Sequence, residues 1–319
     1  MVKLETSDGL IWDVESKIIE MSAEISLTGK LVIDLNNEGP DVNELGLYKI
    51  LDLLTDRFNI RKRDVSIITK NLLEQHTEYN VNIVDPHFHV FAQQYLKTNL
   101  VPAKDISKHF GIFIGRSNWV RLYLSGIVFN EYRDKALQTF HYESSSDFHK
   151  VNLGIEKLLH IKGQGSLNDV APIVLASPIT QEQVSYPILT PKNFSITSLY
   201  KNIFVDIVCE TYFQGNTFFP TEKTWRPIMC KTPFIIQGPR NYLKNLRKLG
   251  FETFSEYWDE SYDEDGPSYG TETIRTNLKM ISSKSLGELE NMYNAMLPKL
   301  EHNQALLKSL NKDSWEIFK

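Results

Sequence analysis

The stretch from residue 216 to 239, NTFFPTEKTWRPIMCKTPFIIQGP, places two cations three residues apart at the start of an expected helix. Thr221 can cap that helix, so Glu222 and Lys223 fall in its first turn and Arg226 lies one turn later. A lysine at this place opposes the helix dipole. An anion shared by Lys223, Arg226 and the helix N-terminus would remove the conflict. The alternative is that both cations are solvated surface charges.

A second polar pair, Glu210 and Thr211, ends the apolar run IFVDIVCET. This run reads as a buried strand, and ligands of open α/β sheets bind beyond the carboxyl ends of the strands. The pair is therefore expected to help shape a ligand pocket beside the Thr221 helix.

Candidate proton acceptors occur near the N-terminus. Glu38 lies in the loop NNEGPD after a short strand, and Asp85, His87 and His89 form the cluster VDPHFHV. A carboxylate or an imidazole can act as a general base. Glu38 can equally be a solvated loop acid. The two histidines could suit a metal, but no third ligand is evident and a strand edge explains them as well.

The elements that must position these residues follow a β-loop-α-β rhythm. LVIDLNNEG, from residue 31, reads as a strand and loop, ELGLYKILDLLTDRF as an amphipathic helix, and DVSIITKNL as the next strand. This order is typical of a parallel sheet with helical crossovers. The polar stretch TNLVPAKDISK, residues 98–108, is the candidate linker to a second domain.

A second series of α/β units follows this linker. HFGIFIG, ALQTFHY, IFVDIVCET and TPFIIQG read as strands, whereas SNWVRLYLSGIVFNEYR, TEKTWRPIMC and NYLKNLRKLG read as helices. The sequence thus predicts two Rossmann-like, doubly wound α/β domains. The final apolar-periodic segment is helical, and Pro298 is expected to kink or split it.

Bulk composition limits the function classes. The chain has 319 residues, 41% of them hydrophobic, a formal net charge of -5 and two cysteines. This excludes a disordered chain and disfavours a surface that grips nucleic acid overall, although a local basic site stays possible. We find no signal-peptide or membrane-span pattern, which predicts a soluble, cytoplasmic protein without a membrane partner.

Two charged runs leave alternatives open. YDEDG, residues 262–266, has the Asp-x-Asp spacing of a metal motif, but its acidic surroundings favour a solvated loop. Arg240, Lys244 and Lys248 share one face of an expected helix. They could contact an anionic acceptor such as DNA or an acidic glycan, although a solvated face explains them more simply.

The run FFPTEKTWRPIMCKTPFIIQGP resembles the nucleotide-sugar-binding segment of the fucosyltransferase family, and in particular the fucosyltransferase-like enzymes of large DNA viruses and phages. The resemblance covers residues 205–262 closely and reaches back to about residue 110. It implies a two-domain fold of the glycosyltransferase-B type, with a central cleft. Residues 1–105 would bind the acceptor, 106–275 the nucleotide sugar, and 276–319 would be C-terminal helices that pack back on the N-terminal domain.

The resemblance also implies roles for single residues. Phe219 takes the aromatic place near the nucleotide base, where the family usually has Tyr. Glu222 takes the place of the ribose-binding acid, and Lys223 that of the diphosphate-binding lysine. GRSNWVR resembles the run that opens the first donor-domain helix, with Asn118 and with Arg116 or Arg121 at the place of its phosphate-binding arginine.

The function that follows is the transfer of a sugar from a GDP- or UDP-sugar, with GDP-fucose-like donors favoured, to a hydroxyl of a glycan or other acceptor. The transfer expected from this resemblance is inverting. Because cations and helix amides can stabilise the leaving diphosphate, it is expected to need no metal or other cofactor. Glu38, Asp85 and His87 are the candidate catalytic residues. The alternatives are a non-catalytic nucleotide-sugar or glycan-binding module of the same fold, and a nucleotide-dependent enzyme such as a methyltransferase. The methyltransferase alternative lacks support because no GxGxxG run follows an early strand.

Overall fold

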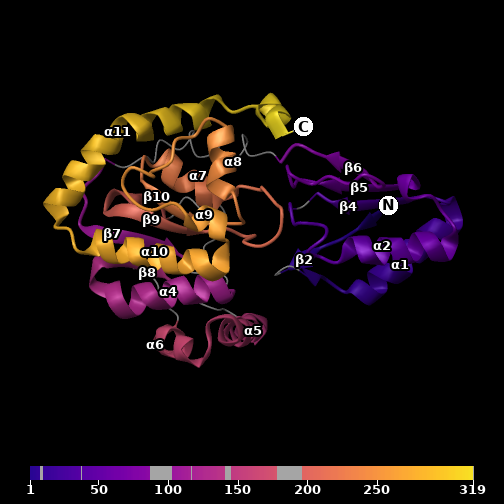
Figure 1. Ribbon diagram of the computed structural model, residues 1–319, viewed down its shortest axis with the longest axis horizontal. Helices are drawn as coiled ribbons and strands as arrows, with labels where there is room; N and C mark the ends of the chain where they lie inside the picture. The colour runs from indigo at the N-terminus through magenta and orange to yellow at the C-terminus, as the bar shows by residue number, and fades with distance from the viewer. Residues whose placement is uncertain are drawn as a thin grey trace. The chain divides into compact units, whose positions relative to one another are not determined.

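The computed structural model describes residues 1–7, 10–36, 38–86, 103–115, 117–140, 145–177 and 196–318. The chain divides into two compact units, each built on a parallel sheet (Figure 1). The first unit comprises Met1–His87, Tyr212–Phe219 and Lys312–Lys319. The second comprises Phe88–Thr211 and Pro220–Asn311. The α/β class predicted from the sequence is confirmed.

The sheet of the first unit has the strand order β1-β4-β5-β6, and every pairing in it is parallel. Its strands are β1 (Val2–Lys3), β4 (Leu31–Leu35), β5 (Val65–Thr69) and β6 (Asn80–Ile83). Helices α1 (Val14–Thr28) and α2 (Leu47–Phe58) connect β1, β4 and β5. A small antiparallel pair, β2 (Thr6–Ser7) and β3 (Leu10–Ile11), precedes α1. The short helix η1 (Lys62–Asp64) precedes β5. Because the order of these four described strands rises steadily, the winding does not reverse among them.

Alternation along β5 shows how the first core forms. Val65 and Ile67 are buried, whereas Ser66 and Ile68 between them are half-buried. Successive side chains of a strand point to opposite faces, so one face of the sheet carries the core. Helix α2 adds Leu47, Leu51 and Leu54 to the same cluster of buried side chains.

The sheet of the second unit has the order β10-β9-β7-β8 and is also parallel throughout. Its strands are β7 (Lys108–Phe113), β8 (Ala136–Thr139), β9 (Ile203–Cys209) and β10 (Phe234–Gln237). Its helices are α4 (Trp119–Tyr132), α5 (Ser145–Lys162), α6 (Leu167–Ala176), α7 (Glu222–Met229), α8 (Tyr242–Lys248), α9 (Tyr262–Asp265), α10 (Pro267–Ser282) and α11 (Leu286–Ser309). The short helices η2 (Arg133–Lys135), η3 (Gln164–Ser166) and η4 (Thr197–Lys201) also belong to it, and η5 (Lys312–Phe318) belongs to the first unit.

The winding of this second sheet reverses at its centre. From β7 the chain passes through α4 to β8 on one side, and from β9 it passes through α7 to β10 on the other. Since parallel crossovers are right-handed, the two helices cover opposite faces, with α4 and α10 on one and α7 and α11 on the other (Figure 1). The carboxyl ends of β7 and β9 therefore form a topological switch point, where open α/β sheets bind ligands.

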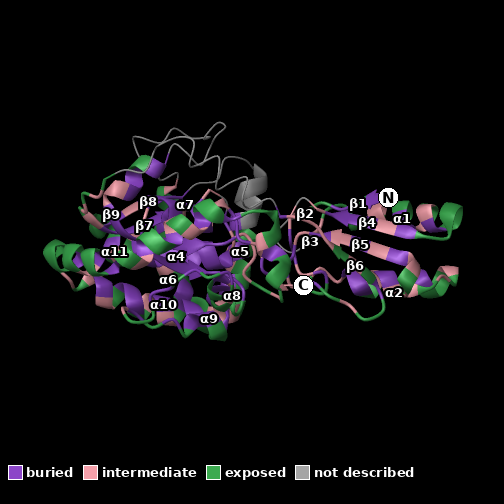
Figure 2. Cartoon of the chain, turned by 90° about the horizontal axis from the view of Figure 1, so that it is seen from above, coloured by how far each residue is buried: buried purple, intermediate pink, exposed green. Residues whose placement is uncertain are grey.

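The second core is formed by strands that are mainly apolar. Every residue of β9 and of β10 is buried, including the polar Asp206 and Gln237. Most residues of α4 are buried as well (Figure 2). Helices on both faces of a parallel sheet exclude water from both sides of its strands, which explains why these runs are largely apolar.

The C-terminal region differs in part from the expectation. Helix α11 runs unbroken from Leu286 to Ser309 with Pro298 inside it, so of the two expected effects of the proline, a kink or a split, the split is wrong. Its buried side chains Met296 and Leu300 flank the proline, and their packing offsets the missing backbone hydrogen bond. Residues 276–311 belong to the second unit, and only residues 312–319 belong to the first.

The described part of the expected linker, residues 103–107, is fixed to the second unit. The Lys104 Nζ atom lies within hydrogen-bond distance of the carbonyls of Tyr200 (2.7 Å) and Ile203 (2.9 Å) and of the hydroxyl of Thr232 (2.7 Å). Because these contacts hold the segment to η4 and to the strands of the second unit, the expected boundary at residue 105 is displaced toward the N-terminus.

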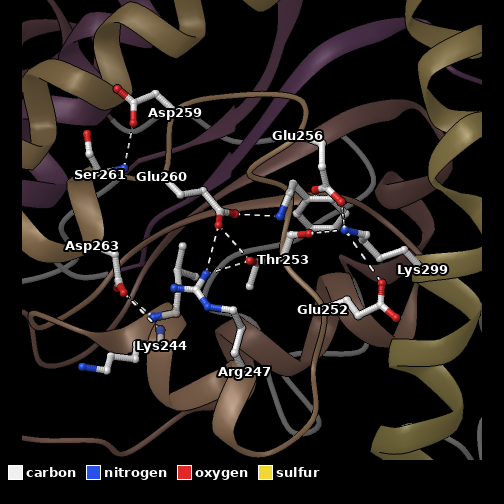
Figure 3. Close-up of polar contacts among 12 residues, drawn as sticks. Lys244, Arg247, Glu252, Thr253, Glu256, Asp259, Glu260, Ser261, Asp263 and Lys299 are labelled. Atoms are coloured by element: carbon white, nitrogen blue, oxygen red, sulfur yellow. Dashed lines mark hydrogen bonds and ion pairs between the residues drawn. The ribbon is translucent and has the colours of Figure 1, made fainter.

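The acidic run at residues 262–266 is not a solvated loop. Asp263 is buried, and its carboxylate accepts the backbone N–H groups of Leu243 (2.7 Å) and Lys244 (3.1 Å) at the start of α8 (Figure 3). Nearby, Glu260 accepts from Thr253 and Arg247. These carboxylates satisfy backbone and side-chain donors, which gives the run a structural role.

Candidate functional site

The candidate residues of the second unit gather at its switch point. Glu210 and Thr211 directly follow β9, and Asn118 directly precedes α4, the helix that follows β7. Thr221 precedes α7. The sequence predicted these placements, and the strand order explains why segments about 90 residues apart, such as 118 and 210, meet at one edge.

Glu210 is the centre of the hydrogen bonds at this edge. Its carboxylate accepts from the N–H and hydroxyl of Thr221 (3.1 and 2.6 Å), from the N–H of Thr211 (3.1 Å) and from the hydroxyls of Thr224 (2.7 Å) and Tyr242 (3.0 Å). The side chain is 2% exposed. Glu210 therefore supplies its own negative charge beside the start of α7 and positions that helix.

Thr221 caps α7 as the sequence predicted, and its hydroxyl accepts the N–H of Lys223 at 3.4 Å. The Lys223 ammonium lies within reach of Glu222 Oε1 (2.9 Å), Thr211 Oγ1 (3.1 Å) and Thr221 Oγ1 (3.2 Å). About a fifth of its side chain, 22%, remains exposed. The cation is thus held at the helix N-terminus by neutral oxygens and one carboxylate.

Glu222 and Arg226 complete the charges of this turn. Burial alone would raise the pKa of Glu222, but the charges of Lys223 and Arg226 outweigh it and hold the pKa at about 2. Arg226 is 7% exposed, so the alternative that it is a solvated surface charge is wrong. The sequence alone could not show that Arg226 points inward, because a cation in a short helix is usually solvated.

Helix α4 contributes a second N-terminus. Asn118 caps it, accepting the N–H of Arg121 at 3.0 Å. The buried Arg121 guanidinium donates from Nη2 to the carbonyls of Glu210 (2.9 Å) and Cys209 (3.4 Å). Arg121 thereby ties α4 to the end of β9. Arg116, the other arginine considered for phosphate binding, lies outside the described residues.

Glu38 and Phe219 belong to the first unit. Glu38 is half-buried after β4, and its carboxylate accepts the hydroxyl of Tyr212. The same hydroxyl lies 3.2 Å from Thr6 Oγ1. Phe219 packs beside Gly39 in the first unit, whereas Glu222 and Lys223 belong to the second unit.

Asp85 follows β6 by two residues and lines a cavity of the first unit. His87 and His89, the other members of this cluster, lie outside the described residues. Within the ranges that the structure describes, no group of three or more His, Cys, Asp or Glu side chains is arranged to hold a metal ion. In the same ranges, no helix is long and apolar enough to cross a membrane.

The sequence did not identify several residues that take part in these sites. Thr224 and Tyr242 support Glu210, and Tyr212 contacts Glu38. Ser117 has a buried hydroxyl with no hydrogen-bond partner among the described residues. A signal existed for Ser117, which directly precedes the cap residue Asn118, and for Thr224, which lies three positions after the cap residue Thr221. No spacing rule connects Tyr212 or Tyr242 to their carboxylates.

Comparisons of the chain with protein-family models, with curated proteins and with solved structures find no match. The fold and the site geometry are therefore the observations from which a function can be argued.

Proposed function

We propose that the protein is a glycosyltransferase that binds a nucleotide sugar through its second unit, with a GDP-fucose-like donor favoured by the resemblance of residues 205–262 to fucosyltransferases. The observation that carries the proposal is the pair of capped helices, α4 and α7, that begin at one switch point beside Lys223. Helix N-termini and a nearby ammonium form a common cradle for phosphate groups.

The chemistry of sugar transfer suits this arrangement. When the bond between the sugar and the diphosphate breaks, negative charge grows on the leaving phosphate oxygen. Lys223 is exposed enough to reach a ligand, and its contacts with Thr211 and Thr221 keep it at the start of α7. It would stabilise this charge together with the amide groups of the helix.

Glu222 would change partner when the donor binds. In the structure its carboxylate neutralises Lys223 at 2.9 Å. A diphosphate that takes over Lys223 would release Glu222 as a hydrogen-bond acceptor for the ribose hydroxyls, the role that the family resemblance assigns to it. Arg226 would remain buried and stabilise the ionised carboxylate.

The first unit would bind the acceptor, in the two-domain arrangement of glycosyltransferase-B enzymes. Glu38 is our preferred general base because it follows a strand at the carboxyl edge of a parallel sheet and its carboxylate is oriented by Tyr212. Asp85 lies at the same edge, two positions along the strand order.

The test is to incubate the protein with a panel of GDP-, UDP- and other nucleotide sugars, with and without glycan acceptors, and to measure release of the free nucleoside diphosphate. We expect turnover with at least one donor, and we expect Glu38→Gln to abolish turnover while donor binding persists. A donor that binds without turnover under any acceptor condition would favour the non-catalytic module. No binding of any donor would contradict the proposal.

A further inference from the structure

One segment of the chain, residues 212–219, connects the residues assigned above to the donor with the loop that carries Glu38. It starts directly after Thr211 and ends two positions before Thr221. Both threonines lie beside the Lys223 ammonium, with distances from Nζ to Oγ1 of 3.1 and 3.2 Å. The segment itself belongs to the first unit, so donor residues of the second unit flank it on both sides along the chain.

The start of this segment is bonded to the loop after β4. Tyr212 donates its hydroxyl to the Glu38 carboxylate, and the same hydroxyl lies 3.2 Å from Thr6 Oγ1. A phenolic hydroxyl can donate once and accept as well, so both contacts can form together. The N–H of Asn216 donates to the carboxylate of Asp41, three positions after Glu38. The segment therefore holds the Glu38 loop by more than one bond.

The second half of the segment has a buried anchor. Asn71, which is 0% exposed, accepts the N–H of Phe218 at 3.1 Å and donates to the carbonyl of Asn216 at 3.0 Å. Its amide also lies 3.2 Å from the carboxylate of Glu74, which accepts the hydroxyl of Tyr48 at 2.8 Å. Because buried, satisfied networks are rigid, a displacement at the start of the segment is expected to act near its first residue.

We propose that Tyr212 is a positioning residue that couples donor binding at Lys223 to the orientation of Glu38. Thr211, the preceding residue, is held by its N–H to Glu210 (3.1 Å) and by its hydroxyl to Lys223. A Tyr212 that is fixed on Glu38 keeps Thr211 in place and lowers the ordering cost of donor binding. By linkage, a bound donor steadies Tyr212 against Glu38 to the same extent. The coupling rests on the proposed function, because it needs a nucleotide at Lys223.

The first measurement is the affinity of the full chain for GDP and UDP by calorimetry. We expect Tyr212→Phe to bind the nucleotide that the parent binds about three- to tenfold more weakly, at the low end of couplings between separate sites. Tyr79→Phe is the matched control, because the Tyr79 hydroxyl donates to the Asp52 carboxylate at 2.8 Å in the same unit, away from this segment. This control should bind the nucleotide as the parent does.

Hydrogen exchange tests the reciprocal effect in the unaltered protein. The N–H of Glu38 donates to the carbonyl of Leu35 (3.4 Å), and that of Asn216 donates to Asp41. Saturating nucleotide should slow exchange in the peptides that carry these two groups, as well as at the first turn of α7. In Tyr212→Phe, the nucleotide should still protect α7, whereas the protection around Glu38 should be lost.

The outcomes separate this inference from the proposed function. A parent that binds neither GDP nor UDP contradicts the proposed function and the coupling with it. If the parent binds, equal or tighter binding by Tyr212→Phe, or unchanged exchange around Glu38, overturns the coupling alone. An equal loss of affinity in Tyr79→Phe also overturns it, because the effect would then come from a general loosening of the first unit.

Discussion

At the scale of single residues, the titration of Glu222, which is paired with Lys223, should produce a measurable pH dependence of the free energy of unfolding. The pKa of Glu222 is lowered to about 2 from its ordinary value near 4.5, despite its burial, by Lys223 and Arg226. The folded state therefore releases this proton more readily than the unfolded chain. The resulting stability is fully present above about pH 4.5 and is lost as the pH falls toward 2.

Glu222→Gln should accordingly lower the free energy of unfolding by on the order of 2 kcal/mol at neutral pH, and by progressively less below about pH 4.5. Urea unfolding of parent and variant over this range measures the difference. A difference that stays constant with pH would show that Glu222 does not titrate as described. Glu264→Gln, which removes an exposed carboxylate of α9, is the control for the loss of a surface acid.

The sequence predicted where the polar residues of this site lie, but not which side chains they contact. Thr221, Glu222 and Lys223 lie where the cap and first-turn rules placed them. The rules could not find that the anion beside the start of α7 is Glu210, because that contact spans 11 residues and depends on how α7 folds back on β9. Nor could they find Tyr242, which comes from another helix.

At the scale of elements, Glu210 should determine whether α7 begins in the right place. Glu210→Gln replaces one acceptor oxygen by a donor; at the Oε2 position this leaves both the N–H of Thr211 and the hydroxyl of Thr221 without their acceptor. Because buried unsatisfied groups are costly, we expect a loss of about 2–4 kcal/mol of stability. Hydrogen exchange should also speed up at the first turn of α7.

Tyr242→Phe is a milder change in the same hydrogen-bond network. It removes one hydroxyl that lies 3.0 Å from Glu210 and 2.8 Å from Thr224, so the expected loss is only about 1 kcal/mol. Equal effects of the two variants, or unchanged exchange at α7 in Glu210→Gln, would contradict the role assigned to Glu210.

Lys104 joins the segment before β7 to the ends of η4, β9 and β10. Burial lowers the pKa of its ammonium to about 7, whereas the unfolded chain keeps an ordinary value near 10.5. Between these values the unfolded state holds the proton and the folded state does not, so the Lys104 contribution makes stability rise with pH from about 7 to 10.5. In Lys104→Met this part of the rise should disappear.

The measurement is denaturant unfolding of parent and Lys104→Met at several pH values across that window. Lys108→Met is the control for the loss of a lysine from the same stretch of chain, since its ammonium donates to the carbonyl of Asp134 at an exposed place. A parent and a Lys104→Met variant with the same pH slope would argue that Lys104 stays charged in the folded protein.

Among the elements, the long apolar runs were predictable and the weakly patterned ones were not. Strands β4, β5, β7, β9 and β10 and helices α2, α4, α7 and α8 follow the expected positions. Strand β1 has only two residues, and α1 exposes Ile19 and Leu27, at 70% and 84%, which blurs its apolar face. Both were missed because their places are set by the neighbouring β4 rather than by local pattern.

At the scale of the whole molecule, each unit is made of separate segments of the chain, so a single boundary between two domains does not describe the division. Residues 212–219, between β9 and α7, belong to the first unit. Asn71 accepts the N–H of Phe218 (3.1 Å) and donates to the carbonyl of Asn216 (3.0 Å), and Thr217 donates to Gly39. No composition signal marks this segment, which explains why continuous boundaries were expected.

Gly39 tests how tightly this segment is packed. A Cβ at residue 39 would lie 2.8 Å from the N atom of Asn71 and 2.9 Å from Cβ of Phe219. Gly39→Ala should therefore destabilise the protein by about 1–3 kcal/mol, as overpacking does. Gly287→Ala, in the first turn of α11 with open space around it, should be neutral or stabilising. Thermal unfolding compares them, and an unchanged Gly39→Ala variant would show that the segment is loosely held.

The central claim is that a nucleoside diphosphate binds beside Lys223 in the second unit, and calorimetric titration of GDP and UDP tests it most directly. We expect one of them to bind the parent, to bind Lys223→Ala at least about tenfold more weakly, and to bind Lys244→Ala, an exposed cation of α8, as it binds the parent. Binding that is absent in the parent, or equal in parent and Lys223→Ala, would contradict the account.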